Sequence, residues 1–159
     1  MINGAHHVSL STADMEAMLY FYRDLLGLRQ VSDGGFGPGE MPAFETVVGL
    51  RDTRVRSAWL HVGNVFVEIF EYAEPTPTKL SPARSCDVGL RHIAFDVTDI
   101  DDEYDRLKAA GVTFLSAPQT IGGVVRAVYL RDPDGNIVEF QEVLPGGQVD
   151  RAHIVGLPQ

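Results

Sequence analysis

Two stretches of the chain repeat one pattern and decide the fold: HVSLSTADMEAMLYFYRDLLG at residues 7–27 and HIAFDVTDIDDEYDRLKAAG at residues 92–111. Each begins with a histidine, alternates through a short strand, reaches an aspartate seven residues later and continues as a helix to a glycine. The ends of the repeats also correspond, since GNVFVE at 63–68 is matched by GNIVE at 135–139. The sequence therefore predicts two copies of one strand–helix–strands unit.

The helices are predicted to follow Asp14 and Asp99, because aspartate is a favoured N-cap residue, and to stop at Gly27 and Gly111. Alternation and β-branched content predict strands at residues 5–11, 44–48, 54–62, 65–72, 90–97, 112–116, 124–131 and 136–143. The Gly-rich segment 32–41 is interpreted as irregular, either a mobile flap over a site or a plain surface loop.

These elements divide the chain into four parts. The first module spans residues 1–73, a linker with three prolines spans 74–87, the second module spans 88–144, and a tail without periodicity spans 145–159. The two modules are expected to build one α+β domain.

Composition excludes several classes of function. The 159 residues carry a formal net charge of −9, which disfavours a nucleic-acid partner. No apolar run approaches the ~20 residues that a membrane span requires. The single cysteine, Cys86, cannot form an internal disulfide, and together with the lack of a recognisable signal peptide this predicts a cytoplasmic protein.

Four polar residues occupy repeat-equivalent strand positions: His7 with Glu68, and His92 with Glu139. Strand side chains alternate between faces, so each histidine and each glutamate lies on the face turned away from the apolar residues that cover the helix. A carboxylate in such apolar strands is costly to bury without a partner. Two imidazoles and two carboxylates suit one divalent metal, namely Zn, Ni, Co, Mn or Fe(II).

The remaining histidines and the cysteine are weaker candidates. His6 is expected to point to the face opposite His7 and to be structural, and His61 either faces the pocket or is a packed or surface residue. His153 lies in the tail and is expected to be solvated. Cys86 has no plausible catalytic partner in sequence, which disfavours a nucleophilic role.

Four segments within residues 5–143 resemble the vicinal oxygen chelate superfamily: HVSLSTADMEAMLYFYRDLLGL, VEIFEY, LRHIAFDVTDID and LRDPDGNIVEF. This superfamily includes glyoxalase I, methylmalonyl-CoA epimerase, extradiol dioxygenases and antibiotic-resistance proteins. The resemblance implies paired βαβββ modules whose mixed sheets curve around a metal, and a homodimer. The family's metal ligands match His7, Glu68, His92 and Glu139.

The glyoxalase-like branch is the most similar, because both of its acidic ligand positions are present. The resemblance implies a lyase, isomerase or epimerase that moves a proton next to a carbonyl through a metal-bound enediolate. Glu139 is the predicted base, with Glu68 opposing it across the metal. Glu45 is a weaker candidate for a second base, with an exposed loop glutamate as the alternative interpretation.

Two other functions remain open: an Fe(II) dioxygenase of the extradiol type that uses His7, His92 and Glu139, and a small-molecule binding or resistance protein. The substrate is expected to be a small molecule, with an anion or a thioester as the candidates. Four arginines are candidates for neutralising its charge, and three aromatic residues that share the face of Glu68 are candidates for an apolar pocket: Arg54, Arg56, Arg91 and Arg126; Phe66, Phe70 and Tyr72.

Overall fold

The computed structural model describes residues 1–147 and divides the chain into two compact units, between Leu80 and Ser81. The first unit contains β1 (His7–Thr12), α1 (Met15–Leu19), the π-helix η1 (Tyr20–Leu25), β2 (Arg29–Phe36), α2 (Pro42–Val48), β3 (Arg54–Val62) and β4 (Val65–Glu74). The second contains β5 (His92–Asp96), α3 (Ile100–Ala109), β6 (Gln119–Ile121), β7 (Val125–Arg131) and β8 (Ile137–Val143).

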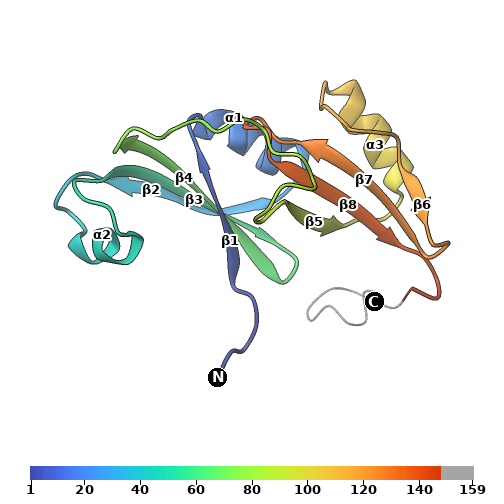
Figure 1. Cartoon of the computed structure of the whole chain (residues 1–159), viewed down its shortest axis with the longest axis horizontal. Helices are drawn as coiled ribbons and strands as arrows, with labels where there is room; N and C mark the ends of the chain where they lie inside the picture. The colour runs from blue at the N-terminus through green and yellow to red at the C-terminus, as the bar shows by residue number, and fades with distance from the viewer. Residues whose placement is uncertain (148–159) are drawn as a thin grey trace. The chain divides into compact units, whose positions relative to one another are not determined.

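Each unit has one mixed four-stranded sheet with the same topology (Figure 1). The strand orders are β1-β4-β3-β2 and β5-β8-β7-β6; the first pair in each sheet is parallel and the others are antiparallel. This confirms the predicted α+β class. No helix within residues 1–147 has the length and apolar character needed to cross a bilayer.

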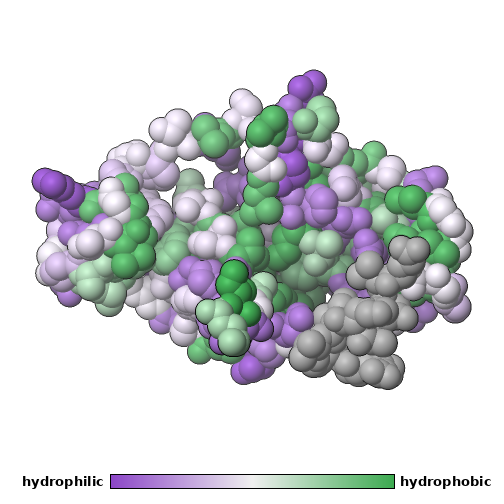
Figure 2. All heavy atoms as spheres, turned by 60° about the horizontal axis from the view of Figure 1, so that its bottom comes forward, coloured by the Kyte–Doolittle hydropathy of each residue, from purple (hydrophilic) through white to green (hydrophobic). Residues whose placement is uncertain are grey.

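The core of each unit lies between the helix and one face of the sheet. Alternation along the strands turns apolar residues to this face, where burial removes their surface from water. The largest fully buried side chains are Tyr22, Met15, Met18, Leu19, Leu60, Ile69 and Val67 in the first unit, and Ile100, Leu107, Leu130 and Val138 in the second. Ile137 is also fully buried but lies on the opposite face of its sheet, the face of Glu139. On the face of the molecule shown in Figure 2, hydrophobic and hydrophilic residues are interspersed.

The two helices begin in different ways. Asp14 caps α1 as predicted, since its Oδ1 accepts a hydrogen bond of 3.0 Å from the backbone N–H of Ala17. Asp99 precedes α3 but makes no side-chain cap bond, because its backbone lies in the left-handed region at φ 56°. The expected role of the Asp99 side chain as a cap is therefore wrong.

At the start of each helix, a glutamate from a strand of the same unit accepts a backbone hydrogen bond. Glu71 Oε1 accepts from the backbone N–H of Met15 at 3.0 Å, and Glu142 Oε1 accepts from that of Asp99, also at 3.0 Å. Helix N-termini carry unpaired N–H groups and favour negative charge, so both carboxylates stabilise the first turn.

An arginine accompanies each of these glutamates. Arg56 lies opposite Glu71 in the β3–β4 ladder, and Arg126 lies opposite Glu142 in the β7–β8 ladder. Each arginine also pairs with the second residue of the helix: Arg56 with Glu16 at 2.7 Å, and Arg126 with Asp101 at 2.7 Å. The repeat therefore extends to the contacts that attach helix to sheet.

Three predicted elements are wrong. Residues 44–48 are helical, since α2 begins at Pro42, which is favoured in a first turn, and is stopped by Gly49 at φ 70°. Residues 32–36 belong to β2, not to a loop. Residues 112–116 form only an isolated bridge between Phe114 and Leu130, and strand β6 lies farther along.

Candidate metal centre

His7 and Glu68 come together in the first unit because β1 and β4 run parallel in a fixed register. Ser9 lies opposite Glu68, which places His7 two residues earlier on the same face. The His7 Nε2–Glu68 Oε2 distance is 3.4 Å. The Glu68 side chain is only 10% exposed, whereas that of His7 is 38% exposed.

His92 and Glu139 repeat this arrangement in the second unit. Ala94 lies opposite Glu139 in the parallel β5–β8 ladder, and the His92 Nε2–Glu139 Oε2 distance is 3.1 Å. The exposures are again unequal, at 37% for the histidine and 12% for the glutamate. Each unit thus presents one nearly buried carboxylate and one accessible imidazole nitrogen.

Burial disfavours the charged form of both carboxylates. Burial raises the pKa of Glu68, while His7 and a hydrogen bond from Ser9 oppose that rise. Burial also raises the pKa of Glu139, with His92 opposing it. The Ser9 hydroxyl has no counterpart in the second unit, where the equivalent residue is Ala94.

The donor types and distances fit a divalent cation. Nitrogen and oxygen ligands at ~2.0–2.2 Å from one ion lie roughly 3.0–3.5 Å apart, which is the spacing of both pairs. Within residues 1–147, no single group of three or more His, Cys, Asp or Glu side chains is close enough to hold a metal. Each unit instead supplies one His–Glu pair with this spacing.

Aromatic residues surround Glu68 on its own face of the sheet. The register places Phe70 and Tyr72 of β4 there, with their ring centroids 5.7 Å apart. Helix α2 adds Phe44, whose ring lies 5.6 Å from Phe70 and 4.9 Å from Phe36 of β2. The contributions of Phe36 and Phe44 were missed from sequence because β2 and α2 were assigned wrongly.

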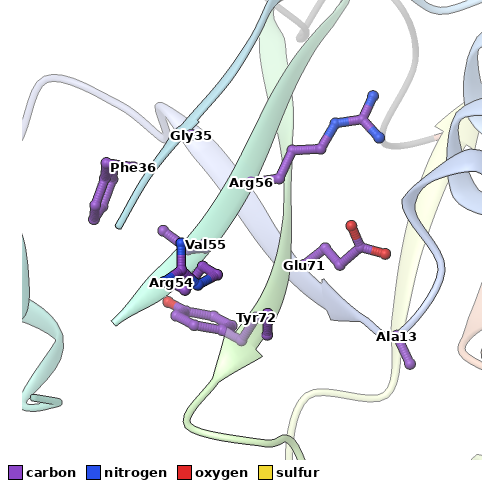
Figure 3. A pocket seen from close by; sticks show the side chains of 9 residues that line it. Ala13, Gly35, Phe36, Arg54, Val55, Arg56, Glu71 and Tyr72 are labelled. Carbon is purple, nitrogen blue, oxygen red and sulfur yellow. The ribbon is translucent and has the colours of Figure 1, made fainter. Parts of the chain in front are cut away.

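Arg56 and Arg126 do not lie on the sheet faces that carry the His–Glu pairs. Both are held in the helix-to-sheet ion pairs, and Arg56 also makes two hydrogen bonds to Asp33, of 2.9 and 2.7 Å. Figure 3 shows Arg56 and Glu71 pointing away from the side on which Phe36 and Tyr72 lie. These ion pairs give Arg56 and Arg126 structural contacts, and a role of either residue in neutralising a substrate charge stays a prediction.

The other candidate arginines have different surroundings. Arg54 lies at a bulge in β3 and pairs with Glu74 at 3.6 Å. The Arg91 Nε is buried and has no hydrogen-bond partner among the described residues. A role of Arg54 or Arg91 in neutralising a substrate charge stays a prediction.

A pocket of about 480 Å³ opens where β3 begins and β4 ends (Figure 3). Its walls come from both faces of the sheet: Ala13, Gly35, Phe36, Arg54, Val55, Arg56, Glu71, Tyr72 and Ala73. It contains neither His7 nor Glu68, so it is separate from the first ligand pair.

Glu45 lies in the first turn of α2, and its side chain accepts hydrogen bonds. Its Oε1 accepts from the Thr53 backbone N–H at 2.7 Å and from the Thr53 hydroxyl at 3.0 Å, and Thr53 is fully buried. These contacts give Glu45 a structural role. Its role as a second base stays a prediction.

His6 lies on the same side as His7, not on the opposite one. Its ring stacks on Phe66 at 5.6 Å, and Phe66 shares the His7 face. The expected orientation is wrong because β1 begins at His7, so alternation does not extend to His6.

His61 also lies on this face, with its ring 5.0 Å from Phe66. Cys86 is exposed, and His153 lies outside the described residues.

Known proteins are similar to this chain over most of its length. The family model of the Glyoxalase/Bleomycin resistance protein/Dioxygenase superfamily matches residues 4–140. A 2-epi-5-epi-valiolone epimerase of Actinomyces sp is 30% identical, and the alignment covers 97% of this chain and 87% of the relative.

Solved structures show the same fold. A glyoxalase family protein of Bacillus cereus superposes with a TM-score of 0.80 at 22% identity, covering 91% of this chain and 96% of the other. A fosfomycin resistance protein of Listeria monocytogenes, solved with Mn(II) and sulfate, superposes with a TM-score of 0.59 at 19% identity, covering 89% and 93%.

Proposed function

The chain belongs to the glyoxalase/bleomycin resistance protein/dioxygenase superfamily, and from this premise we propose that it is a metal-dependent enzyme that moves a proton next to a substrate carbonyl. The reaction class is that of an isomerase, an epimerase or a glyoxalase-like lyase. An epimerase among its relatives supports this class. The substrate is a small molecule, and the assembly implied by the resemblance is a homodimer.

The observation that carries the proposal is the duplication of one ligand pair. His7 with Glu68 and His92 with Glu139 occupy the same ladder positions in the two units, and both pairs have the donor spacing of metal ligands. A carboxylate buried beside an accessible imidazole is expensive unless a cation compensates it. We infer that the two pairs together hold one divalent ion, which is Zn, Ni, Co, Mn or Fe(II).

Held by His7, Glu68, His92 and Glu139, the ion would supply Lewis-acid polarisation of the substrate carbonyl. The protein's part is then to move the proton. A Glu139 oxygen takes the proton from the carbon next to the carbonyl and returns it, either to the same carbon or to its neighbour. Return to the neighbouring carbon is isomerisation. Epimerisation requires a second acid that delivers a proton from the opposite face of the substrate, and Glu45 is the candidate for that role.

The two glutamates are suited to different tasks. Ser9 lies opposite Glu68 and lowers the pKa of its carboxylate, which favours Glu68 as a charged ligand. Ala94 lies opposite Glu139 and offers no hydroxyl, so the pKa of Glu139 is not lowered in this way, which favours Glu139 as the base. The aromatic residues Phe36, Phe44 and Phe70 give the substrate an apolar wall on the face of Glu68.

Elemental analysis of the purified protein tests the metal site. The wild-type chain is expected to retain a divalent metal, and Glu68→Gln and His92→Ala are expected to lose most of it. His61→Ala is the matched control, since it removes an imidazole from the same face but not from the ligand set. Undiminished metal content in both ligand variants would overturn the site.

Solvent-deuterium exchange tests the reaction. The metal-loaded protein is incubated in deuterated water with acyl-thioesters and thiohemiacetals, and exchange at the carbon next to the carbonyl is followed by NMR. Exchange that disappears in Glu139→Gln supports the proposal. Turnover that instead requires ferrous iron and oxygen would reassign the protein as a dioxygenase.

A further inference from the structure

A third position is duplicated on the strand beside each ligand glutamate. Trp59 of β3 lies directly opposite Glu68, and Tyr129 of β7 lies directly opposite Glu139. Both residues therefore share the face of the proposed metal ligands. The sequence repeat does not reveal this correspondence, because the two residue types differ.

Each of these aromatic rings contacts the histidine of its own pair. The Trp59 and His7 ring centroids are 5.0 Å apart at an interplanar angle of 64°. The Tyr129 and His92 centroids are 5.4 Å apart at 38°. Rings at such separations attract one another beyond the area that they bury. Each imidazole thus has an aromatic ring on one side and a carboxylate near its Nε2.

We propose that Trp59 and Tyr129 are positioning residues that hold His7 and His92 with Nε2 directed at the ligand glutamate. This inference rests on the proposed metal site. A surface histidine samples several side-chain orientations, and binding a metal requires only one of them. An aromatic ring that limits those orientations in advance lowers the entropic cost of binding.

The two units differ in how much further support the histidine has. His6 Nδ1 lies 2.9 Å from His7 Nδ1, so the side of the His7 imidazole away from Glu68 has a second polar contact. No histidine precedes His92, because the equivalent residue is Arg91. Tyr129 is therefore expected to matter more than Trp59 for metal affinity.

The chain supplies its own reporter for the test, since Trp59 is its single tryptophan. The metal-free protein is titrated with Co²⁺, and Trp59 fluorescence is expected to be quenched because the His7 ring lies 5.0 Å away. Affinity for Zn²⁺ is measured by chelator competition in the wild type, Trp59→Ala, Trp59→Phe, Tyr129→Ala and Tyr129→Phe. Tyr104→Ala is the matched control, because Tyr104 packs on Phe114 and not on His92.

The alanine variants are expected to bind Zn²⁺ about three- to ten-fold more weakly, with the larger loss in Tyr129→Ala. The phenylalanine variants are expected to stay within about two-fold of wild type, since they keep a ring. Thermal unfolding with a chelator present separates this effect from stability. If Tyr129→Ala does not fold, Tyr129→Leu replaces it, because leucine retains apolar bulk without a ring.

Each outcome has a distinct meaning. Unchanged affinity in both alanine variants overturns the positioning role and leaves the metal site intact. An equal loss in Tyr104→Ala also overturns it, because the effect would then follow general destabilisation. A wild-type protein that binds neither Zn²⁺ nor Co²⁺ overturns the proposed function itself.

Discussion

Ser9 lies directly opposite Glu68 in the parallel β1–β4 ladder, and its hydroxyl lowers the pKa of that carboxylate. The second unit has the same ladder but places Ala94 opposite Glu139. The two ligand glutamates are therefore alike in burial and position but unlike in the residue opposite them. This asymmetry supports the separate tasks proposed for them, Glu68 as a ligand and Glu139 as the base.

Exchanging the two partners tests the assignment. Ala94→Ser supplies Glu139 with a hydroxyl donor and is expected to slow proton exchange about tenfold, since a hydrogen bond to a charged group contributes about 1.5–3 kcal/mol. Metal content should be unchanged. Ser9→Ala is the reciprocal variant and should weaken metal retention more than exchange. Faster exchange in Ala94→Ser would contradict the assignment.

Glu45 offers a direct choice between a structural and a catalytic role. Its Oε1 accepts two hydrogen bonds from Thr53, so Glu45→Ala is expected to lower the free energy of unfolding by about 1–3 kcal/mol. Glu45→Gln keeps an acceptor oxygen and should lose less. Denaturant unfolding measures both. If Glu45→Gln instead retained stability but abolished proton exchange, Glu45 would be a base.

Two adjacent glycines of β2 provide a matched pair for the edge strand. A Cβ on Gly35 would lie 2.5 Å from the Val55 carbonyl oxygen, whereas a Cβ on Gly34 would meet nothing within 4 Å. Gly35→Ala is therefore expected to lower the free energy of unfolding by about 1–3 kcal/mol, the usual cost of overpacking. Gly34→Ala should stay within about 0.5 kcal/mol of wild type. Equal effects would show that β2 is not paired as described.

The ion pair of Asp33 with Arg56 predicts a dependence of stability on pH. Hydrogen bonding to Arg56 holds the pKa of Asp33 below its usual value near 3.8. The unfolded chain therefore takes up a proton at higher pH than the folded one, so the stabilisation is present above about pH 4 and is lost as the pH falls through the folded pKa.

Asp33→Asn is accordingly expected to lower the free energy of unfolding by about 1 kcal/mol at pH 7, since the pair is partly solvent-screened. The difference from wild type should narrow below pH 4, as measured by urea unfolding across a pH series. Asp24→Asn is the control, because its partner Arg23 is the adjacent residue. A difference that grew on acidification would have the wrong sign.

Much of the frame was predictable because local sequence and tertiary contacts agree there. Strand β3 has the predicted bounds, and α1 begins at its predicted cap. The prediction of a strand in the FETVV segment of α2 was wrong because its β-branched residues favour strand, whereas Pro42 and the contacts of Glu45 with Thr53 favour helix. The prediction of a loop in place of strand β2 was wrong because its glycines indicate a loop locally, although pairing with β3 requires a small residue at Gly35.

The candidate site was predictable where the repeat preserves residue type and not elsewhere. His7 and His92, like Glu68 and Glu139, are identical pairs, so alignment alone selects them as candidates. Trp59 and Tyr129 are equivalent only through strand register, which sequence does not specify. Arg56 and Arg126 suggested anion binding because their carboxylate partners lie far away in sequence.

The alternation of roles along β4 has an evolutionary consequence. Glu68 belongs to the face of the proposed metal site, and Glu71, on the other face, holds the start of α1. Strand β8 divides its residues in the same way between Glu139 and Glu142. A substitution on the first face can therefore alter metal choice or substrate without breaking the contacts on the second. Such a scaffold can acquire new reactions one residue at a time while it continues to fold.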